Sequence, residues 1–307
     1  MLTYLAQRVA QFALVLIGVL TIVFLLQHMS GDPTGLLVPM DAPDSARVEL
    51  RHQLGLDRPL GEQYVIFLRN VAMGDLGRSY QSQQPAIALV LDRLPDTLLL
   101  ATSALGLSLL IALPLGIYAA VRRNSWIDAL ASGVSLIGQA MPVYWIGLLA
   151  ILLFAVHWRL LPSMGGGSFK ALILPAATLA VYSSANLMRM TRSAMLDVLH
   201  QDYVRLARAK GLSEPVVLIK HALRNAAIPI VTVIGLQFGG LLGGAVITET
   251  VFAWPGVGRL AVAAVQHRDF PVVQAVTVVI ALIFSSINLM TDLIYALLNP
   301  RIRFGGR

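Results

Sequence analysis

The sequence contains no cysteine and few charged residues. Charged residues make up 13% of its 307 residues, about half of the roughly 25% that is usual in soluble globular proteins. The absence of cysteine excludes disulfide scaffolds, thiol catalysis, iron–sulfur clusters and zinc sites built from thiolates. The sequence has instead 57% hydrophobic residues and a mean hydropathy of +0.74. This composition favours a membrane protein over a soluble or disordered one.

Three common motifs of catalysis and nucleotide binding are also missing. The sequence has no G-x-x-x-x-G-K-[ST] for phosphates, no H-E-x-x-H for zinc and no G-x-S-x-G for a serine nucleophile. Its six histidines are dispersed and are never paired at the spacing of metal ligands. We therefore expect this chain to be no enzyme and to bind no metal or cofactor itself.

Six long intervals contain no Asp, Glu, Lys or Arg. They are 18 to 30 residues long. A helix that crosses the hydrocarbon core needs about 20 apolar residues, so each interval is long enough to span the membrane once. The intervals are Val9–Gly31, Thr97–Val121, Ala129–Trp158, Ala171–Met188, Asn225–Thr248 and Phe270–Thr291. The sequence therefore predicts an all-α membrane protein with six transmembrane helices.

The distribution of Lys and Arg predicts the orientation of these helices. Six crossings place both termini on one side, and that side would hold 13 cations, whereas the two short loops opposite hold four. By the positive-inside rule we expect both termini in the cytoplasm. The inner membrane of a bacterium as the location is implied only by the family resemblance described below. The net charge of +7 then reflects this topology and anionic lipid. No basic stretch alternates with aromatic residues as a nucleic-acid surface would, so lipid is an expected partner and nucleic acid is not.

The spans divide the chain into four parts. Residues 1–31 hold the N-terminus and the first span, 32–94 form an external segment, 95–300 form a core of five helices, and 301–307 form a cytoplasmic tail. The external segment contains two helical patterns, at 45–54 and from Gln63 onward; the second has one apolar stripe made by Tyr64, Phe67, Leu68 and Val71. We expect a small helical cap on the outer membrane surface, and a mobile loop is the alternative.

The long cytoplasmic loop, at about 191–226, contains a second amphipathic pattern. Asp197–Lys210 alternates charged and apolar positions as a surface helix does, and Gly211 is placed to end it. Pro215 is expected to start a second short helix. From composition alone, a solvated charged hairpin and a docking element are equally good interpretations.

Polar residues inside the spans are uncharged and have two interpretations. They can line a pathway or join helices by hydrogen bonds. The candidates for the pathway are Gln139, Asn186, Gln237, Ser285 and Asn288. In the fifth span, Gly235, Gly239 and Gly243 recur every four residues and predict a flat face for close helix packing. Four prolines interrupt spans, as expected where helices bend around a cavity; they are Pro114, Pro142, Pro175 and Pro229.

Four of the carboxylates come close to membrane depth, and each lies at the end of an uncharged interval. They are Asp96, Asp128, Glu249 and Asp292. Carboxylates at membrane depth are often functional, but at the border they more often cap helices or pair with cations. An ion-coupled secondary transporter would need a buried coupling carboxylate or broken half-helices in matching repeats. Neither is evident in the sequence.

Several long motifs, in order along the whole chain, resemble one family. The sequence is similar to permease subunits of ABC importers for dipeptides, oligopeptides and nickel. The stretches that carry the resemblance are Gly31-Asp32-Pro33, GLDRPL (55–60), GDLGRS (74–79), DYVRLARAKGLSE (202–214), HALRNAAIP (221–229), ETVFAWPGVGRL (249–260), RDFPVVQA (268–275) and DLIYALLNPRIR (292–303). The resemblance implies a type I ABC importer permease bundle with the helical segment as a small periplasmic cap.

The resemblance also implies sites and partners. The long cytoplasmic loop becomes a coupling loop that contacts an ATPase, through Tyr203, Arg205, Ala207, Arg208, Lys210, Gly211 and Leu212. The family's motif begins E-A-A with a glycine four residues later, and here those positions are Arg205, Leu206, Ala207 and Gly211. The motif's glutamate and first alanine are replaced, so the glutamate contact is not carried over. Ala207 is expected to allow close approach of the ATPase, and Gly211 to adopt a positive φ. The candidates for a periplasmic gate or a contact with the binding protein are Glu249, Trp254, Pro255 and Gly256.

The function that the resemblance implies is ATP-driven import. The implied partners are a second homologous permease in a heterodimer, two ABC ATPase subunits and a periplasmic or lipid-anchored solute-binding protein. ATP and Mg²⁺ are expected on the ATPase subunits and no cofactor on this chain. Short peptides are the expected cargo; glutathione, a nickel chelate or another small solute are the alternatives. An ion-coupled secondary transporter is the distant alternative.

Overall fold

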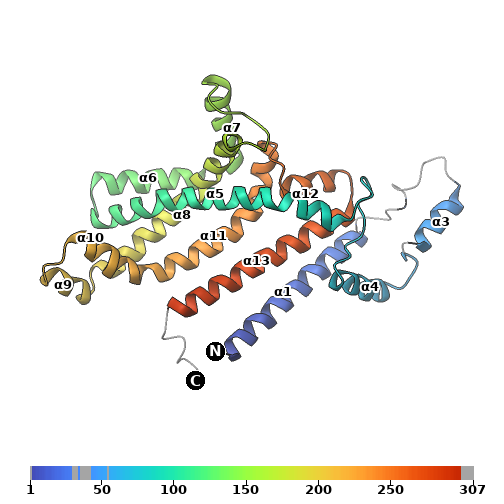
Figure 1. The fold of residues 1–307 in the computed structure, drawn as a ribbon, viewed down its shortest axis with the longest axis horizontal. Coiled ribbons are helices and arrows are strands. Elements are labelled where there is room, and N and C mark those ends of the chain that lie inside the picture. Colours follow the sequence, from blue (N-terminus) through green and yellow to red (C-terminus); the bar gives the residue numbers. More distant parts are fainter. Residues whose placement is uncertain (1, 30–33, 35–42, 54, 299–307) are drawn as a thin grey trace. The chain divides into compact units, whose positions relative to one another are not determined.

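The structure is a computed structural model that describes residues 2–29, 34, 43–53 and 55–298 (Figure 1). The motif Gly31-Asp32-Pro33 and the predicted tail at 301–307 lie outside the described residues. The named elements are all helical: α1 (Leu2–Met29), α3 (Asp44–Gln53), α4 (Leu60–Ala72), α5 (Ala86–Val121), α6 (Trp126–Ala140), α7 (Val143–Ala150), the π-helix η1 (Ile151–His157), α8 (Phe169–Leu199), α9 (Asp202–Ala209), α10 (Glu214–Val216), the π-helix η2 (Val217–Leu223), α11 (Arg224–Val251), α12 (Val257–Gln266) and α13 (Phe270–Leu298).

Five of the six predicted spans are single long apolar helices, and the third is broken. Its two halves, α6 and the continuous α7–η1 helix, meet at an angle of 102°. Met141 is extended (φ −81°, ψ 132°), which is the conformation favoured before a proline. Pro142 has no amide hydrogen to continue the α6 hydrogen bonds, and it starts α7 instead. The other three prolines lie inside the continuous helices α5, α8 and α11, so of the four only Pro142 separates two helices.

The chain folds as two compact units, one of residues 1–94 and 260–282 and one of residues 95–259 and 283–307. In the larger unit α8 is the central helix, since it packs against α6, α7 and α11. In the most apolar 18-residue stretch of α8, 67% of the residues are buried, whereas 11% are buried in the corresponding stretch of α1. Small residues fill the space between these helices; a side chain at Gly116 of α5 would come within 2.7 Å of Thr191 on α8. Close packing of this kind is usual between membrane helices.

In the smaller unit α4 packs on the first span. The Tyr64 hydroxyl lies 2.6 Å from that of Thr21, and the Tyr64 and Phe67 rings pack against Phe24 at centroid distances of 5.2 and 5.7 Å. Gln63 adds a hydrogen bond of 2.8 Å to His28. The predicted apolar stripe of α4 is therefore half-buried, and Tyr64 and Phe67 of this stripe pack on α1. The two helices predicted in this segment are present as α3 and α4.

The loop between α4 and α5 is fixed by a buried carboxylate on the turn before α13. Asp269 accepts hydrogen bonds from the Ser79 hydroxyl at 2.5 Å and from the Tyr80 amide at 3.1 Å. Burial, together with the nearby Asp269 charge, raises the pKa of Tyr80 to about 12. Gly77, with φ +80°, has Pro271 3.4 Å from where its side chain would begin. The motifs GDLGRS and RDFPVVQA therefore meet in one structural contact.

Candidate functional site

The amphipathic helix of the loop at about 191–226, α9, is shorter than predicted. The expected helix began at Asp197, but α8 continues to Leu199 and α9 begins at Asp202. Gln201 between them is extended (φ −74°, ψ 148°), which breaks the helical hydrogen-bond pattern. At the other end Gly211 has φ +76°, which confirms the predicted left-handed exit from the helix. Pro215 lies in the first turn of α10, also as predicted.

The two faces of α9 have different environments. Val204 and Ala207 are buried at 0% and 4% exposure and pack with Val217 of η2. Tyr203 and Leu206 lie on the opposite, exposed face, and Leu212 follows the helix at 40% exposure. Ala207 therefore packs inside this chain, and its predicted role in close approach of an ATPase stays a prediction.

Charged residues surround the exposed face of α9. Arg208 donates to Glu214 at 2.8 Å and thereby closes the turn that contains Gly211. Arg205 and Lys210 are exposed. Burial raises the pKa of Tyr203, and a hydrogen bond to the Asn225 side chain lowers it in part. The face presents apolar and cationic side chains together, which is suited to binding another protein.

The ETVFAWPGVGRL motif folds around the carboxylate of Glu249. This side chain is fully buried; it accepts a hydrogen bond from the Thr97 hydroxyl at 2.7 Å and one from the Arg259 amide at 3.0 Å. The Gly258 amide is a further donor. The amides of Gly258 and Arg259 belong to the first turn of α12, where no helical partner is available. Glu249 thus caps α12 from the end of α11, which agrees with its interpretation as a border carboxylate that caps a helix.

The rest of the motif completes this buried hairpin. Trp254 is 1% exposed, and its indole donates to the Asp96 carbonyl at 3.0 Å. A side chain at Gly256 would overlap the Glu249 carboxylate, and one at Gly258 would come within 2.6 Å of the Val246 backbone. Pro255 is half-buried.

This burial bears on one of the two roles predicted for the motif. Glu249 and Trp254 form the core of the hairpin and are not exposed for contact with a binding protein, whereas a role in a periplasmic gate stays a prediction. Three donors of this chain, the Thr97 hydroxyl and the amides of Gly258 and Arg259, hold the Glu249 side chain in place.

Asp128 forms an ion pair, as expected of a border carboxylate, but the sequence interpretation did not identify Arg192 as its partner. The Arg192 guanidinium donates two hydrogen bonds, of 2.5 and 2.8 Å, to the Asp128 carboxylate, which joins α6 to α8. Asp128 also accepts from the Asn124 amide, and the Ser125 hydroxyl accepts from the Asp128 amide. The sequence signal was the S-x-x-D pattern of a capping box at 125–128. The partner on α8 has no signal of that kind.

The five pathway candidates lie on four helices. Asn186 is exposed, and the other four are half-buried. The Gln237 carbonyl oxygen is buried without a partner among the described residues. Within the described part of the chain, no hydrogen bond joins any two of Gln139, Asn186, Gln237, Ser285 and Asn288. Their role in a pathway stays a prediction.

The glycine stripe of α11 is packed at two of its three positions. A side chain at Gly239 would come within 2.7 Å of the Phe284 ring on α13, and one at Gly235 would overlap Thr291 of the same helix. Gly243 has nothing within 4 Å of that position. Close packing by the chain's own helices is therefore present at Gly235 and Gly239 and absent at Gly243.

Among the described residues, no three His, Asp or Glu side chains gather as a metal ion would require.

Two family descriptions together match almost the whole chain. "Binding-protein-dependent transport system inner membrane component" matches residues 112–304, and the corresponding N-terminal description matches residues 1–101. The chain belongs to this family. It is therefore a multi-pass inner-membrane permease of a binding-protein-dependent importer.

Curated relatives match this permease over its full length. It is 43% identical to the glutathione transport system permease protein GsiC of Escherichia coli strain K12, over 99% of this chain and 100% of that protein. It is 41% identical to the protein of the same name from Pectobacterium atrosepticum, with the same coverage. Both names refer to those relatives.

Solved structures share the fold of the permease. A chain of the MetNI methionine ABC transporter in an inward-facing conformation aligns with a TM-score of 0.59 and 19% identity, and covers 69% of this permease and 96% of that chain. A second crystal form of the same transporter gives a TM-score of 0.56 and 20% identity, with the same coverage. The type I ABC importer permease fold that the resemblance implied is confirmed.

Proposed function

We propose that the permease forms half of the translocation path of an ATP-driven importer for short peptide-like solutes, with glutathione as the first solute to test. The observation that supports glutathione as the cargo is the 43% identity, over 99% of this chain, to a permease named for glutathione transport. Glutathione is itself a short peptide, so it falls within the class that the sequence motifs imply.

The proposed assembly supplies what this chain lacks. A second homologous permease would complete the path, two ATPase subunits would bind ATP and Mg²⁺, and a solute-binding protein would deliver the cargo. The 13 Lys and Arg residues on the side of the termini, against four in the two short opposite loops, support cytoplasmic termini. In that orientation α9 faces the ATPase, and α3 and α4 form the periplasmic cap.

We assign ATPase docking to the exposed face of α9. Tyr203, Leu206 and Leu212 supply its apolar surface, at 41%, 56% and 40% exposure, and Arg205 and Lys210 supply a charged rim. Apolar side chains that are exposed together on a charged cytoplasmic segment are typical of a binding surface.

The buried face of α9 is suited to transmit motion. Val204 and Ala207 pack on Val217 of η2, with Val198 of α8 beside them. Since η2 leads directly into α11, a displacement of α9 acts on two spans of the bundle together. A rigid movement of packed helices about an interface is a known form of such switching. ATP binding by the partner subunits would thus rock the bundle between its two access states.

The docking proposal is tested with a charge on the exposed face. Leu206→Asp should leave the permease folded, because this side chain is 56% exposed, while retention of the ATPase on purification from the native membrane falls at least about tenfold. Leu160→Asp is the matched control, since Leu160 is 65% exposed outside the coupling loop. Equal ATPase retention by both variants would refute docking through α9.

The cargo is tested by uptake in cells. Deletion of the permease gene should abolish binding-protein-dependent uptake of labelled glutathione, and the wild-type gene should restore it. Labelled dipeptides and a nickel chelate are measured in the same strains. Normal glutathione uptake in the deletion strain, with loss of another of these solutes, would refute glutathione and identify the alternative.

A further inference from the structure

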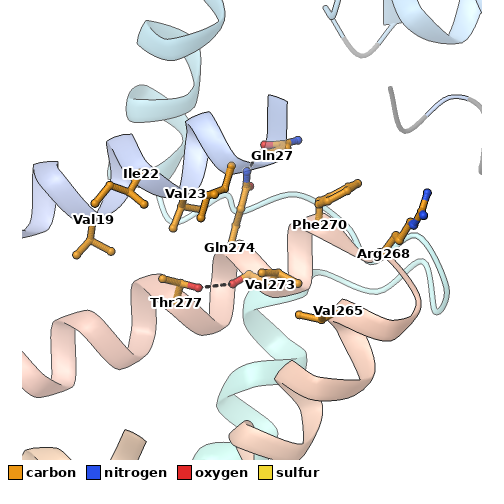
Figure 2. Close-up of a pocket in the computed structure, with 11 residues that line it drawn as sticks. Val19, Ile22, Val23, Gln27, Val265, Arg268, Phe270, Val273, Gln274 and Thr277 are labelled. Carbon is orange, nitrogen blue, oxygen red and sulfur yellow. Dashed lines mark hydrogen bonds between the residues drawn. The ribbon is translucent and has the colours of Figure 1, made fainter. Parts of the chain in front are cut away.

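The smaller unit contains an open groove between α1 and α13 (Figure 2). It has a volume of about 760 Å³, and its lining is mostly apolar. Val19, Ile22 and Val23 line it from α1, and Val273 lines it from α13. Ile22 is 59% exposed although it lies on a helix that is long and apolar enough to span the membrane. The groove therefore opens to whatever surrounds the permease in the bilayer.

The depth of the groove corresponds to one leaflet of the membrane. Its lining on α1 runs from Val19 to Gln27, which is about 12 Å of helix at 1.5 Å per residue. One leaflet is about half of the roughly 30 Å hydrocarbon core. The groove begins at the end of α1 that is nearest the turn before α13 and stops near the middle of the span. A helix of another subunit would cross both leaflets, whereas a lipid chain occupies one.

The two ends of the groove differ in polarity. Arg268, which is exposed and has no partner in the described structure, lies at the mouth. The neighbouring acidic group, Asp269, is occupied by Ser79 and Tyr80 and is buried. Gln274 donates to Gln27 across the groove, so one donor and one acceptor of these two amides are paired with each other. One cation is thus left at the mouth, above an apolar interior.

We propose that this groove binds a phospholipid of the adjoining leaflet, with an acyl chain along Val19, Ile22 and Val273 and the phosphate of an anionic headgroup beside Arg268. Cationic side chains at the membrane surface attract anionic lipid, and the apolar interior excludes a polar ligand. The bound lipid fills the space between α1 and α13 and stabilises the position of the first span.

Native mass spectrometry tests this site. The permease, purified with its partners in mild detergent, is incubated with equal amounts of phosphatidylglycerol and phosphatidylethanolamine. The expected result is preferential retention of phosphatidylglycerol. Arg268→Gln should reduce that preference about fivefold, and Arg268→Lys should restore most of it. Lys170→Gln removes an exposed cation that does not line the groove, and it should leave the preference unchanged.

A second variant tests the acyl chain. Ile22→Trp fills the groove and should reduce retention of either lipid at least about threefold. Leu110→Trp, at a side chain that is 75% exposed and outside the groove, is the control for added bulk. Equal retention by both tryptophan variants would overturn the proposal, as would equal retention of the two lipids by the wild type.

The occupant is separated from a protein partner by cross-linking. Because the chain has no cysteine, Ile22→Cys carries a unique thiol in the groove. The proposal predicts labelling by a lipid-borne thiol reagent. Efficient cross-linking of this thiol to a second permease subunit, in place of lipid labelling, would overturn it.

Discussion

Removal of the Glu249 carboxylate tests the idea that the hairpin between α11 and α12 is built on a buried acceptor. Glu249→Ala leaves the Thr97 hydroxyl and the Arg259 amide, at 2.7 and 3.0 Å from the carboxylate, without an acceptor. Hydrogen bonds to a charged group contribute about 1.5–3 kcal/mol each. The relief of carboxylate burial offsets part of this loss. We expect a net destabilisation of about 2–4 kcal/mol.

The assay is thermal unfolding of the purified permease in detergent. The variant should unfold at a temperature on the order of 5–10 °C lower than the wild type. Thr97→Val removes the hydroxyl that donates to Glu249 and accepts from the Val257 amide at 2.8 Å, and it should cost about 2 kcal/mol. Thr102→Val is the control, because Thr102 is exposed and its hydroxyl bonds only within its own helix.

A double-mutant cycle decides whether the two groups act together. Glu249→Ala and Thr97→Val remove the same hydrogen bond, so their costs should not add; the coupling should be about 1–2 kcal/mol. Additive costs, or a Glu249→Ala variant as stable as the wild type, would refute the capping role.

Two further predictions concern helix packing in the larger unit. Arg192→Ala leaves Asp128, which is 4% exposed, without its cation and should destabilise the permease by about 3 kcal/mol in thermal unfolding. Arg192→Lys should recover part of this loss, and an Arg192→Ala variant of unchanged stability would contradict the ion pair. A Cβ atom at position 239 would lie 2.7 Å from the Phe284 ring, so Gly239→Leu should reduce the yield of folded permease at least severalfold. Gly243→Leu should not reduce the yield, because a Cβ atom at position 243 has nothing within 4 Å. Similar yields for the two variants would contradict the packing.

The number and position of the spans could be read from the sequence because charge is excluded from the bilayer core. The break at Pro142 could not. The interval Ala129–Trp158 is uniformly apolar, so hydropathy does not distinguish one straight helix from two that meet at 102°. Pro114 and Pro175 lie inside continuous helices. The presence of a proline in a span therefore does not predict which helix is broken.

The direction of side chains on α9 was also beyond the sequence. The periodicity of the sequence predicted an amphipathic helix, and Gly211 predicted where this helix ends, because helix formation and helix termination depend on neighbouring residues. Ala207 faces Val217, a residue ten positions later whose π-helix brings it back against α9. Such a contact depends on the path of the intervening turn, which the resemblance to a family motif does not specify.

The Glu249 hairpin shows the same limit at a functional motif. The sequence singled out ETVFAWPGVGRL through its resemblance to the permease family. It did not reveal that Gly256 and Gly258 are needed to make room for the carboxylate. Glu249 and Trp254 are not exposed for contact with a binding protein, because burial of a motif depends on contacts with Asp96 and Thr97, more than 150 positions away. Their role in a periplasmic gate stays a prediction.

The central claim is that this permease carries solute only when coupled to ATP hydrolysis by a partner. The most direct measurement is uptake of labelled glutathione into proteoliposomes that contain the purified assembly, with ATP inside and the solute-binding protein outside. We predict accumulation that requires ATP and the binding protein together and is lost in Leu206→Asp. Accumulation driven by a proton gradient without ATP would contradict the account.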